Sequence, residues 1–485
     1  MSRQITINPI TRLEGHGKIE IFLDEQGDVE RAFFQVPEIR GFETFCIGRP
    51  SEEMPRITER ICGVCPTAHH MASTKALDDL WKVKPTRTAK LLREMVYNAF
   101  MFEDHNLHFF FLGGPDFIVG PTAPAAERNI LGVINKVGLE IAGQLIKVRR
   151  EIRSIIETVG GKVVHPVFGL PGGVSRGINE EERQRFLASA NTAVEFAQFA
   201  LKAFDDIVLK NQDYVDLILS DGFIHKTYYA GLVDENNKVN FYEHRVRVVD
   251  PEGREVAKFE PHEYTEFIAE HVEPWTYITF PFLKKVGWKG FVDGPDSGVF
   301  RVAPLARLNA SDGMATPLAQ EAYEKMFETL GGKPSHHTLA FHWARLVEAL
   351  QAAEALKGLL EDEEITSDDI RNLPTETPKE GVGIVEAPRG TLIHHYWSDE
   401  DGILTRVNLI VATNHNAAAT AMSVEKAAKA VIHGGHVDDG LLNLVEMAFR
   451  PYDPCHACAT HAIGKTPLVA RIYDHTGKRL REIKR

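Results

Sequence analysis

The sequence predicts a mainly helical α+β protein, with a central bundle of long helices and β-hairpins at its periphery. Two observations lead to this class. Four long segments carry apolar residues at the 3.6-residue period of an α-helix, and other segments alternate apolar and polar residues around turns. Helices this long bury their apolar stripes most simply against one another. Because no domain boundary is evident, we treat residues 1–485 as one unit.

The long helices are predicted over residues 85–112, 123–161, 180–210 and 335–360, and a further helix over 415–432. The third of them shows its stripe clearly, with Phe186, Ala190, Ala193, Ala197, Ala200, Leu201, Phe204 and Val208 on one side.

Strands are expected on both sides of this helical region. The first 35 residues alternate around the turn "DEQGD" and predict a hairpin, and residues 391–413 predict another. Residues 220–312 are rich in Gly, Pro and aromatic residues, which favours hairpins and functional loops. Residues 361–381 are acidic and then interrupted by proline, so we expect them to be exposed.

Composition limits the class of protein. A chain of 485 residues that is 44% hydrophobic can bury a large core. The net charge of −13, without a block of Lys and Arg, argues against a nucleic-acid partner. No run approaches the roughly 18 apolar residues of a membrane span. The N-terminal stretch lacks the pattern of a secretory signal, so we expect a cytoplasmic protein.

Four of the five cysteines form two C-x-x-C pairs, Cys62 and Cys65 in "RICGVCPTAHH" and Cys455 and Cys458 in "DPCHACATH". Thiolates at this spacing suit zinc, iron–sulfur or nickel. Zinc ribbons place their pairs roughly 15–20 residues apart. Here nearly four hundred residues intervene, so the whole fold must bring the pairs together. This favours a catalytic metal centre over a structural zinc, and over a disulfide oxidoreductase, for which one C-x-x-C suffices.

Together with "RLEGH" at 12–16 and "APRG" at 387–390, the two cysteine motifs resemble the large catalytic subunit of nickel–iron hydrogenases over essentially the whole chain. The length and the "ATH" ending are most similar to the cytoplasmic branch, which couples hydrogen to nicotinamide, flavin or disulfide partners. The resemblance implies the large-subunit fold of that family and reversible heterolytic cleavage of H2.

The resemblance also implies a binuclear centre. Nickel would take all four thiolates, with Cys62 and Cys455 terminal, while Cys65 and Cys458 bridge to an iron that carries carbon monoxide and cyanide. Soft thiolates tolerate changes in the oxidation state of nickel.

Other motif positions match further functional residues of the family. Glu14 matches a proton acceptor beside a terminal cysteine, and Arg389 an arginine held over the metal face. Pro388 would line the cyanide pocket, and Asp116 and Asp453 would surround Arg389. From the residues alone, Glu14 could be a solvated loop carboxylate, Arg389 a surface ion-pair partner and Asp453 an N-cap.

The resemblance also implies functions for His69, Glu43 and His461. His69 would hydrogen-bond near a bridging thiolate, although a packed core histidine fits the residues equally well. Glu43, in "RGFE", and His461 resemble ligands of a magnesium ion, a metal that prefers oxygen donors. The tail, residues 462–485, would be removed by a maturation protease; alternatively it is an ordinary hairpin around "DHTGK".

If four cysteines bind the metal pair, only Cys46 remains, whereas an iron–sulfur cluster usually takes four cysteine ligands. We therefore expect that this chain holds no cluster and passes electrons to an iron–sulfur small subunit, with further flavin- and NAD(P)-linked or ferredoxin-linked subunits of the diaphorase type. Two alternatives remain open: the quinone-site coupling subunit of complex I, which typically lacks the four cysteines, and a non-catalytic zinc-bound protein.

Overall fold

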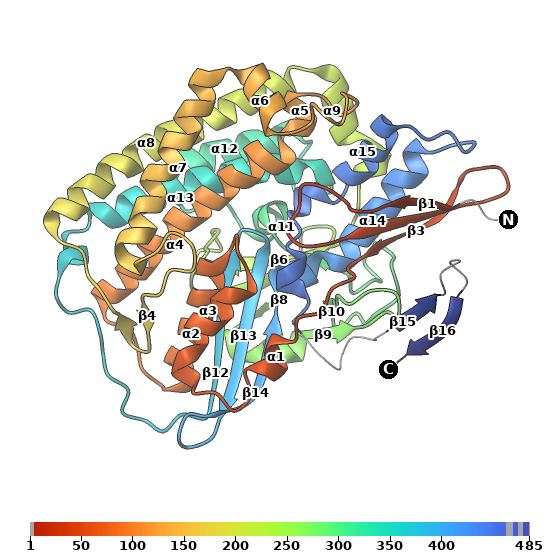
Figure 1. Ribbon diagram of the computed structural model, residues 1–485. Coiled ribbons are helices and arrows are strands. Elements are labelled where there is room, and N and C mark those ends of the chain that lie inside the picture. Colours follow the sequence, from red (N-terminus) through yellow and green to blue (C-terminus); the bar gives the residue numbers. More distant parts are fainter. Residues whose placement is uncertain (1–3, 462–468, 474–478, 485) are drawn as a thin grey trace.

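A bundle of long helices forms one half of the molecule (Figure 1). The computed structural model describes residues 4–461, 469–473 and 479–484. Helix α13 packs against α4 and α8, and α7 packs against the same two helices, which closes the bundle. The predicted bundle of four long helices is therefore confirmed. Its members are α4 (Arg87–Leu107), α7 (Leu139–Gly160), α8 (Glu180–Phe204) and α13 (Phe341–Glu361).

The ends of these helices follow from local signals in the sequence. Helix α8 starts at a capping box, in which Asn179 accepts from the amide of Glu182 and Glu182 accepts from the amide of Asn179. The predicted helix over 123–161 is in fact two helices, α6 (Ile130–Val137) and α7. They separate at Gly138, whose φ of 89° lies in a region that ends a right-handed helix.

Helix α13 is the centre of the bundle. Its first thirteen residues, from Phe341 to Ala353, are all buried. A helix with no exposed face has to accommodate its polar residues inside the protein, and Arg345 and Glu348 are both fully buried there. Arg345 donates to the carbonyl oxygen of Pro451, and Glu348 contacts His105 and Arg307.

A three-stranded antiparallel sheet lies beside the bundle, in the order β12 (Glu380–Ala387), β13 (Gly390–Ser398) and β14 (Leu404–Ile410). The hairpin predicted over 391–413 corresponds to β13 and β14. Strand β12 was not predicted: the stretch expected to be exposed ends where this buried strand begins. Helix α3 (Pro66–Leu80) covers the sheet so closely that a Cβ on Gly383 would lie 2.0 Å from the carbonyl oxygen of Ala72.

The other strands form separate sheets, of which the largest has four strands. The predicted N-terminal hairpin belongs to the meander β1 (Gln4–Ile7), β2 (Lys18–Leu23) and β3 (Val29–Gln35). The middle region predicted as hairpins supplies β6 (Tyr228–Val233), β7 (Arg245–Val249), β8 (Glu255–Phe259), the pair β9 (Ile268–His271) and β10 (Phe280–Leu283), the short β11 (Phe300–Arg301) and helix α11 (Pro304–Ala310). The four-stranded sheet has the order β11-β6-β7-β8.

Helix α14 (Ala412–Val431) agrees with the helix predicted over 415–432, and packs against β3, β10 and β13. Helices α12 (Pro317–Thr329) and α15 (Asp439–Met447) were not predicted. No helix of the described residues is both long enough and apolar enough to cross a bilayer.

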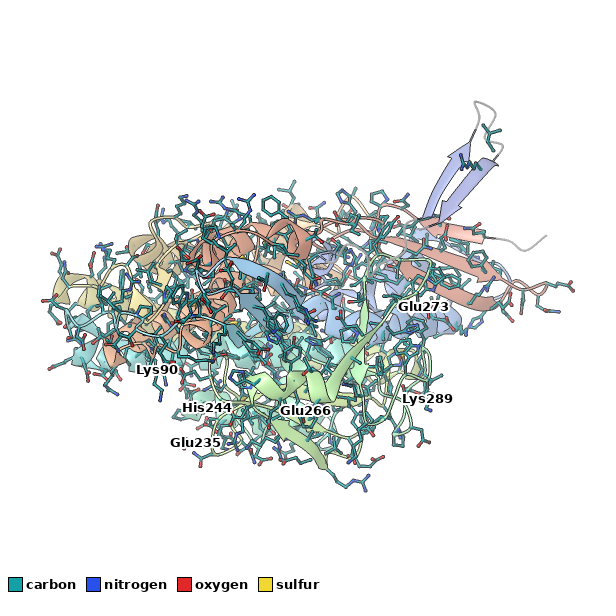
Figure 2. All side chains as sticks on the ribbon, turned by 90° about the horizontal axis from the view of Figure 1, so that it is seen from below. Lys90, Glu235, His244, Glu266, Glu273 and Lys289 are labelled. Carbon is teal, nitrogen blue, oxygen red and sulfur yellow. The ribbon has the colours of Figure 1, made fainter. Side chains whose placement is uncertain are left out.

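The C-terminal strands β15 (Val469–Tyr473) and β16 (Arg479–Lys484) pair with each other in antiparallel register. In Figure 2 this hairpin projects from the rest of the molecule. The turn "DHTGK" around which the alternative hairpin was expected, residues 474–478, lies outside the described residues, as does the segment 462–468 at the start of the predicted tail.

Candidate metal centre

The two cysteine motifs meet because the N-terminal segment pairs with the C-terminal one. The amide of Glu14 donates to the carbonyl oxygen of Pro454, and the amide of His456 donates to that of Glu14. Cys455 stands directly before helix α16 (His456–Ala459), and Cys65 directly before helix α3. The amide of Cys455 also donates to the hydroxyl of Thr413, in the first turn of α14.

The four sulfur atoms form one buried cluster. All of them lie within 4.8 Å of one another. Within the motifs, Sγ of Cys62 is 2.7 Å from that of Cys65, and Sγ of Cys455 is 2.6 Å from that of Cys458. Between the motifs, Cys62 is 3.4 Å from Cys455 and Cys65 is 3.5 Å from Cys458. The fold thus assembles one four-thiolate site from chain segments almost four hundred residues apart.

The donor set of this cluster suits a soft metal cation. Burial raises the pKa of the Cys455 and Cys458 thiols well above the ordinary value, since a buried thiolate lacks water to stabilise its charge. Four thiolates crowded together repel one another further, and a soft metal cation removes both penalties. The donor set therefore fits a thiolate-bound metal. Cys46 is buried as well, with a thiol pKa raised to about 12, but it is not part of the cluster.

Glu14 lies beside this cluster, as the sequence predicts. Its Oε2 accepts from Sγ of Cys455 at 3.0 Å and from the amide of Ala457 at 3.1 Å. Burial raises the pKa of this carboxyl. The next residue, Gly15, has a φ of 84°, and a Cβ there would lie 2.9 Å from the amide nitrogen of Ala457. A glycine is therefore needed for Glu14 to approach the second motif so closely.

Arg389 is buried in the turn between β12 and β13, directly after Pro388. Its guanidinium pairs with Asp104 at 3.1 Å and with Asp453 at 2.9 Å. Burial alone would lower the pKa of Arg389, but these two carboxylates raise it well above the ordinary value. Burial in turn raises the pKa of Asp104 to about 7. Arg389 is thus an internal ion-pair partner rather than a surface one.

The prediction from the sequence that Asp116 lies beside Arg389 is wrong. Asp116 accepts from Arg12 at 2.5 Å and from Arg450 at 3.0 Å. The reason is that α4 ends with Asp104 in its last turn facing Arg389, whereas Asp116 follows a π-helical turn over His108–Gly113 and starts α5 (Pro115–Ile118). No motif marked Asp104, which stands in the polar run "EDHN" (103–106) of the predicted helix.

Asp453 has a left-handed backbone, with a φ of 54°, and its carboxylate turns towards Arg389. Its expected alternative role as an N-cap is not seen, since Cys455 is the residue that precedes α16 and no side chain caps that helix. The left-handed conformation, which Asp tolerates better than most residues, is what aims its side chain at the arginine.

His69 lies on α3, and its Nδ1 is 3.1 Å from Nε2 of His394. Burial lowers the pKa of His69 to about 4, so the ring is neutral. Its Nε2 has no hydrogen-bond partner among the described residues. The structure adds His165, whose Nε2 lies 3.0 Å from the carbonyl oxygen of Cys62 and which no sequence motif indicated.

Glu43, on the short helix α1 (Phe42–Phe45), and His461 lie side by side. Oε1 of Glu43 is 3.7 Å from Nε2 of His461 and also accepts from the amide of Leu409 at 2.7 Å. Nδ1 of His461 lies 3.1 Å from the carbonyl oxygen of Cys458. The fold therefore brings Glu43 and His461, which the family resemblance implies as magnesium ligands, together beside the second cysteine motif.

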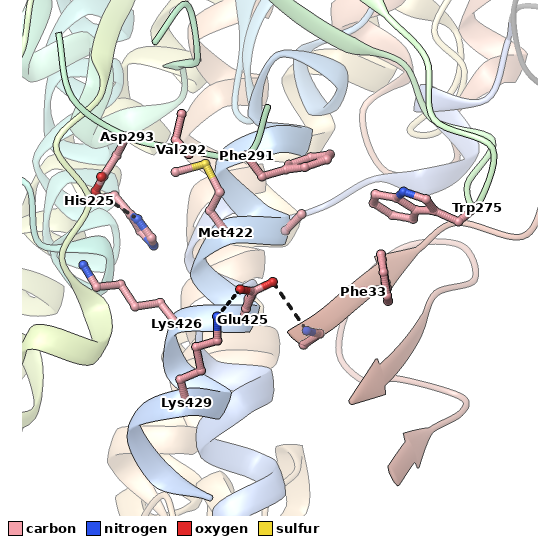
Figure 3. A pocket seen from close by; sticks show the side chains of 12 residues that line it. Phe33, His225, Trp275, Phe291, Val292, Asp293, Met422, Glu425, Lys426 and Lys429 are labelled. Carbon is pink, nitrogen blue, oxygen red and sulfur yellow. Dashed lines mark hydrogen bonds and ion pairs between the residues drawn. The ribbon is translucent and has the colours of Figure 1, made fainter. Parts of the chain in front are cut away.

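A surface pocket of about 320 Å³ lies away from this site, between β3, α14 and the loops that carry Trp275 and Phe291 (Figure 3). Its wall is aromatic on one side and bears Lys426 and His225 on the other. None of the residues predicted to be functional lines it.

A buried four-thiolate cage, with a carboxylate hydrogen-bonded to one sulfur and an ion-paired arginine nearby, is typical of a thiolate-bound metal centre. Residues 40–131 and 143–461 match the nickel-dependent hydrogenase family, and residues 4–39 match a HoxL-like family. The chain belongs to the nickel-dependent hydrogenases, as a large, catalytic subunit that acts on H2.

Individual relatives agree with this assignment. The chain is 49% identical over 484 residues to an iron-sulfur subunit of the F420-non-reducing hydrogenase from Archaeoglobus profundus, covering 99% of each. It is 37% identical to NAD-reducing hydrogenase HoxS subunit beta of Cupriavidus necator, again over 99% of each. It also superimposes on an NAD+-reducing [NiFe]-hydrogenase, in a crystal structure of the H2-reduced state, with a TM-score of 0.89 and 36% identity, covering 95% and 99% of the two chains.

These matches confirm the predicted fold class and the hydrogenase function over both alternatives, the coupling subunit of complex I and the zinc-bound protein. The relatives are named as subunits of larger hydrogenases.

Proposed function

We propose that Cys62, Cys65, Cys455 and Cys458 hold a nickel–iron pair whose iron also carries carbon monoxide and cyanide, and that H2 is cleaved there heterolytically and reversibly. The observation that carries the proposal is the single buried cluster of four sulfurs. By their positions in the two motifs of the nickel-dependent hydrogenase family, Cys65 and Cys458 would be the bridging pair and Cys62 and Cys455 the terminal ligands.

When bound, the metal pair supplies the site that accepts electrons from H2. The protein has to remove the proton, and Glu14 would take it from Sγ of Cys455; the 3.0 Å between Oε2 of Glu14 and that sulfur supports this role. The raised pKa of Glu14 brings its proton affinity closer to that of a thiol, which favours transfer in both directions.

Arg389 contributes a fixed positive charge beside the sulfurs. Its two carboxylate partners, Asp104 and Asp453, hold the guanidinium in one orientation and offset its charge in the buried site. Pro388 precedes it in the same turn and is proposed to line the cyanide pocket. His69, a neutral ring held by His394, is proposed to support a bridging thiolate.

We propose that electrons leave through an iron–sulfur partner subunit, because this chain has one cysteine outside the cluster and iron–sulfur clusters take four. Further subunits would link the complex to a flavin, a nicotinamide or a ferredoxin; one relative is named as NAD-reducing. A cytoplasmic location is part of the same proposal.

Two proposals concern the C-terminal side. Glu43 and His461 would bind magnesium, supported by the 3.7 Å between their side chains. A maturation protease would remove residues 462–485, supported by the family match, which ends at His461.

Infrared spectroscopy of the purified complex, together with metal analysis, tests the central proposal. Carbon monoxide and cyanide stretching bands are expected, with nickel equal in amount to the large subunit and iron in excess of nickel, because the clusters of the partner subunit also contain iron. Zinc alone, without such bands, would overturn it.

A further inference from the structure

Arg307, on α11, is fully buried and bound by two carboxylates from different elements. Its guanidinium makes a two-pronged contact with Glu348 of α13, at 2.6 and 2.5 Å. A third nitrogen donates to Glu386 of β12 at 2.7 Å. A Cβ on Gly231 of β6 would lie 2.7 Å from Cγ of Arg307, so the neighbouring strand leaves room for this side chain. Planar, charge-assisted contacts of this kind hold a guanidinium in a single orientation.

The same guanidinium also holds the turn that carries Arg389. It donates to the carbonyl oxygen of Ala387 at 2.8 Å and to that of Pro388 at 3.4 Å. The next carbonyl, that of Arg389 itself, accepts from Asn416 of α14 at 3.2 Å. Three consecutive carbonyl groups are therefore fixed by buried donors at the point where the chain turns from β12 to β13.

The other side of the cluster reaches the helix that carries the partner of Arg389. Oε2 of Glu348 lies 3.0 Å from Nε2 of His105, and His105 directly follows Asp104 on α4. Burial and the Glu348 contact thus anchor the last turn of α4, from which Asp104 reaches Arg389 at 3.1 Å. The segments that carry Arg389 and Asp104 are therefore both held by the buried Arg307–Glu348 ion pair.

We propose that Arg307 is a positioning residue of the hydrogenase site, which sets the place of the Arg389 guanidinium by holding its backbone turn and, through Glu348 and His105, the helix of Asp104. Arg307 itself does not reach the cysteine cluster. The inference rests on the proposed role of Arg389 beside the metal pair.

The test is a double-mutant cycle on the assembled, metal-loaded complex, with Arg307→Lys, Arg389→Lys and the double variant. Lysine keeps the charge of Arg307 but cannot span the two carboxylates and the two carbonyls. We expect Arg307→Lys to lower kcat up to ~100-fold, as misplacement of a catalytic group by about 1 Å can do. In the Arg389→Lys background the same change should lower kcat by no more than about twofold, because coupled residues are not additive.

Arg93→Lys is the matched control. Arg93 is equally buried, pairs with Asp78 and donates to the carbonyls of Leu170 and Gly173, but it touches neither Arg389 nor its turn. Its effect on kcat should be the same in both backgrounds. Arg307→Lys should also shift the carbonyl and cyanide bands of the loaded enzyme, whereas Arg93→Lys should leave them in place.

The outcomes separate the two levels of inference. Loss of kcat on Arg307→Lys that is undiminished in the Arg389→Lys background, with unshifted bands, overturns the positioning role. Absence of the bands from the parent enzyme overturns the proposed metal centre instead. If Arg307→Lys fails to load metal, Asn416→Ala replaces it: it removes only the donor to the Arg389 carbonyl and the acceptor of the Val302 amide, and the same non-additivity with Arg389→Lys is expected.

Discussion

Oε2 of Glu14 accepts a hydrogen bond from Sγ of Cys455 at 3.0 Å, although 441 residues separate the two along the chain. The backbones of the same two segments pair on either side of this contact. The carboxylate and the thiol are thus brought together by one structural event, the docking of the N-terminal loop on the C-terminal cysteine motif. The carboxylate of Glu14 therefore lies beside the cluster whenever the two segments are paired.

Glu14→Gln should therefore block proton transfer without disturbing the cluster. Glutamine keeps an oxygen for the Ala457 amide but cannot take up a proton. We expect hydrogen–deuterium exchange catalysed by the complex to fall by ~100-fold or more, the usual contribution of a general base. Nickel and iron contents should equal those of the parent.

Glu354→Gln serves as the control for this change. Glu354, on α13, is also half-buried and accepts from two backbone amides, those of Leu318 and Ala319 at the start of α12, but it belongs to neither cysteine motif. Exchange should stay at the parent level. If Glu14→Gln exchanges as fast as Glu354→Gln, Glu14 does not carry the proton.

The cluster also makes a prediction about which cysteines hold metal. Cys62→Ser should abolish nickel binding, because serine is a hard ligand with a far higher pKa than a thiol. Cys46→Ser should keep full nickel and iron, since Cys46 is buried outside the cluster. Metal analysis of the two purified variants decides; equal metal loss in both would mean that the cluster is not the binding site.

Because Asp104 and not Asp116 pairs with Arg389, substitutions at these two residues should affect different properties: activity at Asp104 and stability at Asp116. Asp104→Asn removes the negative charge that pairs with Arg389. We therefore expect kcat to fall by at least ~10-fold, while the metal content stays that of the parent. Asp116→Asn breaks buried ion pairs with Arg12 and Arg450, which costs about 3 kcal/mol of folding free energy. Turnover and chemical denaturation of both variants provide the measurement. A larger loss of kcat in Asp116→Asn would restore the original assignment.

Asp116 also makes the folding stability of the protein depend on pH in the acid range. Burial would raise the pKa of this carboxyl, but Arg450 and Arg12 lower it below its ordinary value. A lowered folded-state pKa means that the stability from Asp116 is present above the unfolded pKa of about 3.9, and is lost as pH falls through the lower folded value. Denaturation curves should therefore show a smaller loss of stability between about pH 5 and pH 3 in Asp116→Asn than in the parent.

The sequence was sufficient where a pattern repeats or a motif is specific. The helical period located all four bundle helices, and the two C-x-x-C motifs located the cluster. The break at Gly138 and the buried strand β12 were missed, because a single glycine and a short apolar run carry little signal before the packing is known.

Residues that act through the fold could not be read from the chain. Asp104, His165 and Arg307 belong to no motif, and each looks like an ordinary polar residue in a helix or loop. Their roles come from contacts with Arg389, Cys62 and the turn after β12, segments that are 285, 103 and about 80 residues away in the sequence. Only the tertiary structure makes these pairs visible.

The tail leads to a prediction about maturation. Residues 462–485 contain seven Lys and Arg and two Asp and Glu, so they carry a net charge of +5, and the rest of the chain carries −18 of the total of −13. The family match ends at His461, one residue before this basic segment begins. Because Cys458 and His461 lie immediately before it, removal of the tail would leave a chain that ends beside the second cysteine motif. We expect the large subunit of active complex to have an intact mass that corresponds to a chain ending at His461, and metal-free protein to have the full-length mass. Active enzyme of full-length mass would exclude obligatory removal of the tail.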